Sequence, residues 1–212
     1  MIINILAGGP TDLWPDNLFE QPGDWLGADR GAWHLLQHGI KPLAALGDFD
    51  SLTSAEQAYL HAQLAEQQIT HVKAEKDETD TELALLHAAK LAPTQINVFG
   101  VTGGRLDHLL SNLWVLTQPE FAGIRERVTL WDATNAVIIR GAGAHTISKL
   151  ADMMYLGFMP MESVVDFKIL DAKYPLVWTS ETPKMWSSNE FVGEEVHIEI
   201  GQGLVMIVQA RD

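Results

Sequence analysis

The sequence predicts an α/β protein: an N-terminal parallel-sheet (Rossmann-like) nucleotide domain followed by a small all-β sandwich. Up to about residue 140, short apolar runs alternate with segments of helical composition, as in a parallel sheet with crossover helices. Beyond residue 141, only short apolar runs remain, separated by Gly, Pro, Asp and Asn, a pattern typical of antiparallel strands. Hydrophobic residues make up 47% of the 212 positions, which suffices for packed cores. We therefore expect domains over residues 1–140 and 141–212.

The first half supplies the alternating elements. Apolar runs predict strands at residues 2–7, 25–28, 43–46, 69–72, 96–99, 128–131 and 136–140. Helical composition predicts helices at residues 31–38, 54–67 and 83–91, and from 108 to 116. Gly39 fits a helix C-cap, and Thr79 with Glu82 fits a capping box. Residues 11–24 hold two prolines and many polar residues, so we expect a loop there.

The second half is expected to contain only strands. They are predicted at residues 145–148, 153–158, 164–170, 176–179, 196–200 and 204–208. Met153 to Met161 is rich in methionine, which commonly fills core gaps. Because Gly, Pro, Asp and Asn separate these short runs, they indicate a small antiparallel sandwich or barrel-like domain.

The composition excludes several classes of protein. The net charge of −14, from 28 acidic and 14 basic residues, argues against a nucleic-acid partner, which needs a basic stripe. The chain has no cysteine, so it has no disulfide, thiolate nucleophile or cysteine zinc site. The start lacks the basic flank of a signal peptide, and no apolar run approaches the ~18 residues that span a bilayer. We expect a cytoplasmic protein with no membrane partner.

Asp48 and Asp50 leave the strand predicted at residues 43–46, within the sequence Gly47–Ser51. Two residues apart in an extended segment, they point the same way. Two carboxylates at one spot repel each other unless a proton or cation lies between them. Mg²⁺, which takes oxygen ligands and substrate phosphates, suits such a pair. The alternative is a solvated turn in which Asp50 or Ser51 caps the next helix.

Aspartates recur at the ends of the predicted strands or on the helix starts beyond them. They are Asp29, Asp48 with Asp50, Asp77 with Asp80, and Asp107. A parallel sheet places such ends on one edge, where open α/β sheets bind ligands. This pattern predicts one or two Mg²⁺ ions and a polyphosphate substrate, and hence nucleotide-dependent phosphoryl chemistry.

One turn adds phosphate-binding features. Gly103 and Gly104 permit close backbone approach, and Arg105 offers a planar fork for phosphate. Asp107 can join a metal or a nucleophile, whereas His108 either orients a phosphate or caps its helix. The usual phosphate motifs, G-x-x-x-x-G-K-[ST] and G-x-G-x-x-G, are absent.

Three segments resemble, in order, the acidic motifs of the thiamine pyrophosphokinase family. They are Gly47–Ser51, Lys76–Asp80 and Thr102–His108. Lys173–Leu176 and Ser188–Phe191 are similar to motifs of the family's C-terminal β-domain, so the resemblance covers most of the chain. It implies an α/β nucleotide domain, a β-sandwich that binds thiamine and dimerises, and a homodimer with shared active sites.

The resemblance also implies an activity and its residues. The family transfers pyrophosphate from ATP to the hydroxyl of thiamine and releases AMP. The implied catalytic residues are Asp48, Asp50, Asp80, Asp107 and Arg105, with Asp48, Asp50, Asp80 and Asp107 as metal ligands. The implied nucleotide- and thiamine-binding residues are Asp29, Asp77, Thr79, Gly103, Gly104, His108, Ser188, Asn189 and Trp186.

The sequence departs from the family at some of these positions. Arg30 and Trp33 stand in the turn around Asp29, where the family has Gly and Asn. Asp171-Ala172 stands where a glycine is usual. Trp186 either stacks on an aromatic cation such as thiamine or closes the sandwich.

Other functions remain open on the residues alone. A pyrophosphokinase for another heterocyclic alcohol, such as a pterin, would share the acidic motifs. Asp48 and Asp50 also resemble the Asp-x-Asp start of haloacid-dehalogenase-type phosphatases, although those place it on the first strand. A non-catalytic Mg-nucleotide sensor would bind nucleotide and make no AMP.

Overall fold

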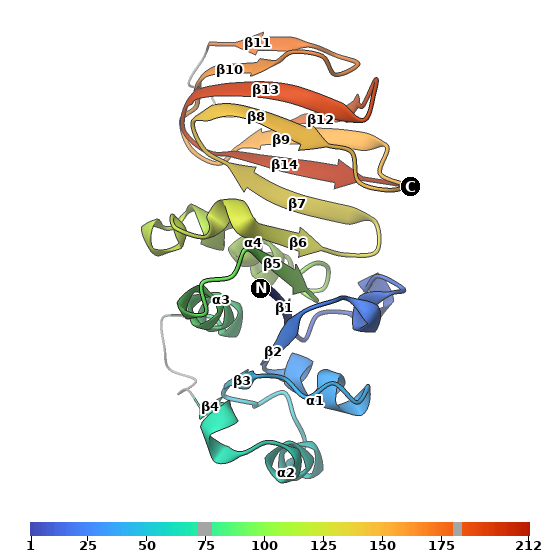
Figure 1. Cartoon of the computed structure of the whole chain (residues 1–212), viewed down its shortest axis with the longest axis vertical. Coiled ribbons are helices and arrows are strands. Elements are labelled where there is room, and N and C mark those ends of the chain that lie inside the picture. Colours follow the sequence, from blue (N-terminus) through green and yellow to red (C-terminus); the bar gives the residue numbers. More distant parts are fainter. Residues whose placement is uncertain (72–77, 180–183) are drawn as a thin grey trace. The chain divides into compact units, whose positions relative to one another are not determined.

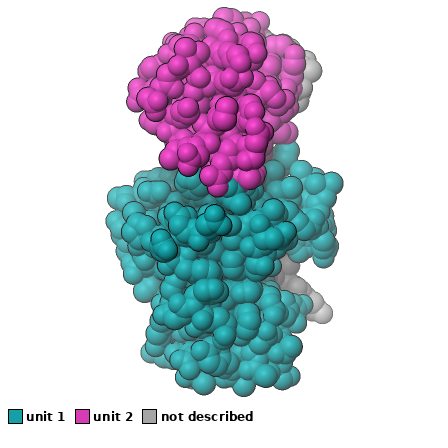
Figure 2. Space-filling view, turned by 90° about the vertical axis from the view of Figure 1, so that its right-hand side faces the viewer, with its two compact units in different colours: residues 1–115, 127–133 teal, residues 116–126, 134–212 magenta. Residues whose placement is uncertain are grey.

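The chain folds into two compact units (Figure 2). The computed structural model describes residues 1–71, 78–179 and 184–212. Unit 1 comprises Met1–Val115 and Arg127–Ala133, and unit 2 comprises Leu116–Glu126 and Thr134–Asp212. Unit 1 thus holds the α/β part of the chain, and unit 2 holds its antiparallel strands.

The strands of unit 1 form a parallel sheet (Figure 1). They are β1 (Ile2–Leu6), β2 (Asp24–Ala28), β3 (Ala44–Gly47), β4 (Ile69–His71), β5 (Gln95–Phe99) and β6 (Val128–Trp131). Their order is β6-β5-β1-β2-β3-β4, and each neighbouring pair is parallel. This confirms the predicted parallel sheet. The order reverses between β1 and β5, the kind of switch point at which open α/β sheets bind ligands.

The helices of unit 1 connect these strands. They are α1 (Arg30–Gln37), α2 (Ser54–Gln63), α3 (Asp80–Lys90) and α4 (Leu106–Trp114). Short 3-10 turns occur at Thr11–Leu13, Leu18–Glu20, Glu66–Gln68, Val115–Thr117, Pro119–Phe121 and Arg125–Arg127. The α1 C-terminus is closed as expected, since Gly39 has φ 74° and its N–H donates to the carbonyl of Leu36. Capping boxes begin α2 at Thr53 and α3 at Thr79, and the second confirms a prediction.

Some predicted boundaries were wrong. The helix predicted to reach residue 67 ends at Gln63, because Leu64 turns to an extended conformation that buries its side chain, 5% exposed. The helix predicted to reach residue 116 ends at Trp114, where the chain tightens into a 3-10 turn. The segment predicted as loop, residues 11–24, contains two 3-10 turns and the first residue of β2.

Two apolar clusters anchor the loops at the carboxyl end of the unit 1 sheet. Phe49 packs with residues of α1, α2 and β3, including Ala32, Ala45 and Leu60. A second cluster comprises Leu6, Leu18, Trp25, Leu35 and Phe99. Turns that start from these strands are therefore fixed by buried side chains immediately beside them.

Unit 2 consists of antiparallel strands. They are β7 (Asn135–Arg140), β8 (Gly143–Ser148), β9 (Tyr155–Pro160), β10 (Val165–Ile169), β11 (Leu176–Trp178), β12 (Trp186–Glu190), β13 (Glu195–Gln202) and β14 (Val205–Ala210). Within this unit, β12-β9-β14-β7 pair in that order, and β11-β10-β13-β8 form a second sheet. One core joins the two sheets, with Phe158 and Ile207 from the first and Phe167 and Ile198 from the second. This confirms a separate antiparallel β part.

Two strands of unit 2 were misread from the sequence. Residues 136–140 were grouped with the parallel half, but β7 pairs antiparallel with β14. The strand β12 was not predicted, because its sequence Trp-Ser-Ser-Asn-Glu has almost no apolar residue. The domain boundary that we expect between residues 140 and 141 stays a prediction. No helix in the described part of the chain combines the length and apolarity needed to cross a bilayer.

Candidate active site

A pocket of about 650 Å³ lies at the carboxyl edge of the unit 1 sheet. It is bordered by the turns that follow β1, β2, β3 and β5 and by the first turns of α3 and α4. The predicted site residues that line it are Asp29, Asp48, Thr79, Asp80, Gly103, Gly104, Arg105, Asp107 and His108. The predicted convergence of the acidic turns on one edge is therefore seen for these residues. Asp77 lies outside the described residues.

Asp29 enters the pocket from the turn between β2 and α1. Its backbone N–H donates to the carbonyl of Leu46 over 2.8 Å, which ties this turn to β3. The helix that follows starts very close to the sheet, because a Cβ at Gly31 would stand 1.8 Å from the carbonyl oxygen of Leu6. Asp29 has φ 47°, a conformation that is costly for a residue with a side chain and recurs at functional sites.

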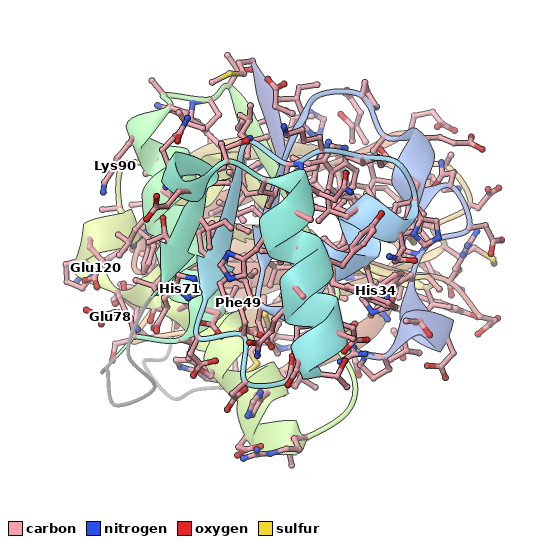
Figure 3. All side chains as sticks on the ribbon, turned by 90° about the horizontal axis from the view of Figure 1, so that it is seen from below. His34, Phe49, His71, Glu78, Lys90 and Glu120 are labelled. Atoms are coloured by element: carbon pink, nitrogen blue, oxygen red, sulfur yellow. The ribbon has the colours of Figure 1, made fainter. Side chains whose placement is uncertain are left out.

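The turn after β3 directs its carboxylates outward by burying the residue between them. Phe49 is 2% exposed and packs edge-on against the ring of His71 at 5.3 Å (Figure 3). Its φ of 58° shows that the chain bends sharply around this buried side chain. Asp48 accepts a hydrogen bond of 3.2 Å from the backbone N–H of Asp50, which tightens the turn.

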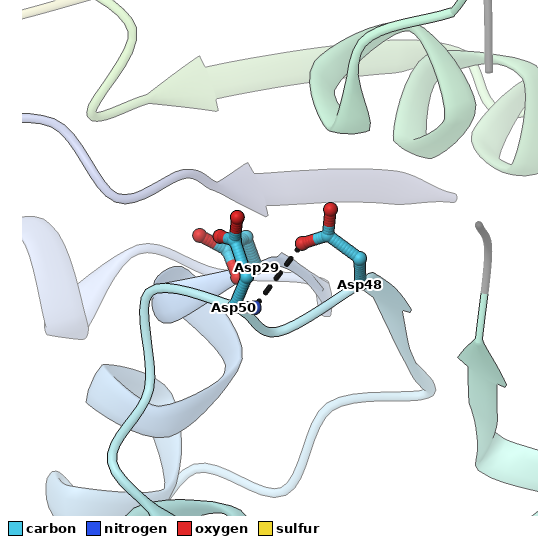
Figure 4. A group of neighbouring side chains, drawn as sticks. All are labelled: Asp29, Asp48 and Asp50. Carbon is cyan, nitrogen blue, oxygen red and sulfur yellow. Dashed lines mark hydrogen bonds between the residues drawn. The ribbon is translucent and has the colours of Figure 1, made fainter. Parts of the chain in front are cut away.

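Asp29, Asp48 and Asp50 form one carboxylate cluster (Figure 4). One carboxylate oxygen from each lies within 4.8 Å of the other two. Burial raises the pKa of Asp29, and the negative charges of Asp80 and Asp48 add to this, although a hydrogen bond from the Ser51 hydroxyl opposes it. The Oδ1 atom of Asp29 is buried and has no hydrogen-bond partner among the described residues. An oxygen left in this state fits a bound cation, and oxygen-only ligands suit Mg²⁺.

Asp80 occupies a different position from this cluster. It is the first residue of α3 and lines the same pocket, where its charge raises the pKa of Asp29. Thr79 accepts a hydrogen bond from the Glu82 N–H, so its side chain serves the helix cap. The predicted metal set of Asp48, Asp50, Asp80 and Asp107 is thus not a single cluster among the described residues, whereas Asp29 does join Asp48 and Asp50.

The glycine-rich turn after β5 carries a balanced ion pair. Gly103 and Gly104 have φ of 72° and 66°, and a Cβ on Gly103 would meet Leu13 at 2.1 Å. Arg105 donates to both oxygens of Asp107, with the shorter contact at 2.5 Å. These hydrogen bonds lower the pKa of Asp107. Both side chains are largely exposed, so a ligand phosphate can compete for the guanidinium.

The predicted acceptor-binding residues lie in unit 2 and differ from one another. Ser188 is exposed, at a bulge of β12, with φ 59°. Asn189 is 4% exposed, and its amide exchanges hydrogen bonds with both backbone groups of Tyr174, at 3.0 and 2.9 Å. Trp186 is partly buried, in contact with Phe167 and Trp178 at the edge of the core. The buried side chain of Asn189 therefore holds β12 against the backbone of Tyr174.

Further residues line the pocket. Gly8 and Gly9 follow β1, and the N–H of Gly9 donates to the carbonyl of Gly100. From the sequence, this glycine pair after an apolar run either lets backbone amides approach a phosphate or only forms a turn. Asn112 also lines the pocket and holds the carbonyl of Val101. No sequence signal marks it, because a lone Asn in a helix is unremarkable.

The pocket has carboxylates on one side and a glycine-rich turn with an arginine on the other. This combination is typical of proteins that bind a phosphorylated ligand together with a divalent cation. The position at the switch point of a parallel sheet agrees with a nucleotide as that ligand.

Comparisons with known proteins specify the family. Residues 16–128 match the catalytic domain of thiamin pyrophosphokinase, and residues 144–205 match its vitamin B1 binding domain. The thiamine pyrophosphokinase of Bacillus subtilis (strain 168) is 33% identical over 217 residues, 99% of each chain. The solved structure of a family protein from Enterococcus faecalis is 32% identical, with a TM-score of 0.93 and 100% of both chains covered. That from Geobacillus thermodenitrificans is 33% identical, with a TM-score of 0.86, covering 100% and 98%. The chain belongs to the thiamine pyrophosphokinase family.

Proposed function

We propose that the unit 1 pocket is the active site at which this enzyme transfers pyrophosphate from ATP to the hydroxyl of thiamine, with Mg²⁺ at the carboxylate cluster. The observation that carries the proposal is the convergence of Asp29, Asp48 and Asp50 within 4.8 Å, with a buried Asp29 oxygen that has no hydrogen-bond partner in the described part of the chain. It lies in the segment that matches the family's catalytic domain. Because ATP is the donor, we place the reaction in the cytoplasm, and we take unit 1 to be a Rossmann-like nucleotide domain.

The residues have separate tasks in this reaction. The thiamine oxygen forms a bond to the β-phosphorus of ATP, the bond from that phosphorus to the oxygen shared with the α-phosphorus breaks, and AMP leaves. Bound Mg²⁺ supplies positive charge to the phosphate oxygens. Asp29, Asp48 and Asp50 would hold it, while Arg105 and the Gly103–Gly104 backbone would hold phosphate. Hydrogen bonds from Arg105 lower the pKa of Asp107, which makes this carboxylate a weak acceptor for the thiamine hydroxyl proton.

The products of the reaction test this proposal. Protein, ATP and Mg²⁺ are incubated with thiamine, with a hydroxymethylpterin or with no acceptor, and the nucleotide is separated by chromatography. We expect AMP and thiamine diphosphate in equal amounts, only with thiamine and only with Mg²⁺. Stoichiometric ADP would indicate an ordinary kinase, and phosphate release without an acceptor would indicate a phosphatase.

We also propose a homodimer with shared active sites, in which the β unit of the second copy supplies Ser188 and Trp186 to bind thiamine, on a strand that the buried Asn189 holds in place. The apolar face of α4 supports an interface, since Leu106, Leu110 and Trp114 recur at helical spacing and are exposed. Mixing inactive Asp50→Asn and Asn189→Ala proteins tests the sharing. With random exchange about half the dimers are mixed, and one working site in each restores about a quarter of wild-type activity. No recovery after confirmed exchange would place each site in a single chain.

A further inference from the structure

Arg30 links two turns that carry the carboxylate cluster. It follows Asp29 in the chain, but its guanidinium is directed to the neighbouring turn rather than to the carboxylates. One nitrogen donates to the carbonyl of Ser51 over 2.6 Å, and another contacts Glu56 over 2.7 Å. The guanidinium also lies 5.2 Å from the centre of the Trp33 ring. Arg30 and Trp33, which both depart from the family pattern in the turn around Asp29, are thus in contact with each other.

Glu56 holds the other side of this link. Its second oxygen accepts hydrogen bonds from the backbone N–H and hydroxyl of Thr53, at 2.8 and 3.0 Å, in the capping box that begins α2. Only 17% of the Glu56 side chain is exposed, so the pair with Arg30 is partly shielded from solvent. The Arg30 guanidinium is thereby fixed to the rigid start of a helix.

Ser51 is held from two sides. Its carbonyl accepts from Arg30, and its hydroxyl donates to the carboxylate of Asp29. Asp50 precedes it directly, in a turn that Phe49 already bends through a left-handed conformation. A displacement of Ser51 would therefore change the positions of both Asp29 and Asp50.

The guanidinium of Arg30 forms its ion pair with Glu56, so the carboxylate cluster of Asp29, Asp48 and Asp50 keeps its negative charge. Burial raises the pKa of Asp29, and a hydrogen bond from the backbone N–H of Arg30 lowers it. An arginine directed at Asp48 or Asp50 would instead occupy the place of a cation. The arrangement holds the cluster in position without neutralising it.

We propose that Arg30 is a positioning residue for the divalent cation, which fixes the Asp48–Ser51 turn against the Asp29 turn through its bonds to Ser51 and Glu56. This inference rests on the proposed function, since it assumes that the carboxylate cluster binds the cation. Residues that orient metal ligands without touching the metal commonly change its affinity by about 10- to 100-fold when replaced.

Direct binding of Mn²⁺, measured by the electron paramagnetic resonance of the free ion, tests this role without turnover. The variants are Arg30→Gln and Glu56→Gln, and the second keeps an oxygen for the Thr53 cap while removing the charge. We expect both to bind Mn²⁺ about 10-fold more weakly than wild type, and Arg30→Lys to recover part of the loss. Lys168→Gln is the matched control, because it breaks a 2.7 Å pair with Glu199 in unit 2 and should leave Mn²⁺ affinity unchanged.

Thermal unfolding in EDTA separates positioning from folding. Each variant should remain folded at the assay temperature, with a loss of Tm similar to that of Lys168→Gln. Wild-type Mn²⁺ affinity in Arg30→Gln, or in Glu56→Gln if the first variant unfolds, would overturn the inference and leave the metal site intact. A wild-type protein that binds no Mn²⁺, or an Asp48→Asn protein that binds it equally well, would instead refute the metal site itself.

Discussion

The two ends of the pocket handle negative charge in opposite ways. At one end, Asp29 and Asp48 line the pocket and form a cluster with the exposed Asp50, and none of the three has an ion pair among the described residues. At the other end, Asp107 is paired with Arg105 within a single turn. The first end is electrostatically incomplete and needs a cation from solution. The second is balanced on its own and can exchange its internal pair for a phosphate.

Removing one charge from the incomplete end should have the largest effect. Asp48→Asn and Asp50→Asn keep the side-chain volume but weaken cation binding, so kcat/KM should fall about 100- to 1000-fold. Initial rates of AMP formation measure this, with Asp16→Asn, an exposed carboxylate elsewhere in unit 1, as the control. Wild-type rates at limiting Mg²⁺ would remove Asp48 and Asp50 from the cation site.

The close packing beneath Asp29 should have the next largest effect. A methyl group in Gly31→Ala would press α1 away from Leu6 and displace the Asp29 turn, with a loss of about 2 kcal/mol in the free energy of unfolding. Urea unfolding measures it. Gly123→Ala is the control, because nothing lies within 4 Å of a Cβ there. Equal stability of the two variants would show that the helix start adapts freely.

The balanced end should respond more weakly. Arg105→Lys keeps the charge but loses the planar fork, so KM for ATP should rise about 10-fold while kcat changes less. Because the pair with Asp107 is exposed, the free energy of unfolding should change little. Steady-state kinetics together with urea unfolding test both statements. A loss of stability without a change in KM would make the pair structural.

The smallest effect concerns pH in the absence of metal. A carboxyl whose pKa is raised on folding binds protons more readily in the native state, so Asp29 should destabilise the metal-free protein as pH rises above about 4. In EDTA, Asp29→Asn should therefore raise the Tm at pH 7, and raise it by less at pH 4. The variant should also lose the increase in Tm that Mg²⁺ gives the wild-type protein. Melting curves of both proteins at the two pH values measure these differences. A lower Tm for the variant at pH 7 would contradict the raised pKa.

Sequence reasoning succeeded where local chemistry determines structure. The placement of Asp48 and Asp50 after a buried strand, and the Thr79 cap, follow from neighbours in the chain. It failed where contacts between segments far apart in the chain determine the structure. Arg30 and Glu56 are 26 residues apart, and Asn189 and Tyr174 are 15 apart, so no periodic pattern indicates either contact. The strand β12 was not predicted from its polar sequence, because it forms by pairing with the distant strand β9.

Binding of the divalent cation by the carboxylate cluster can be seen in crystals. They would be grown with Mn²⁺ and a non-hydrolysable ATP analogue, and the anomalous signal of manganese would locate the ion. We expect a peak at coordination distance, a little over about 2 Å, from oxygens of Asp29, Asp48 and Asp50. A manganese peak bound only by Asp80 or Asp107, with the cluster empty, would contradict it.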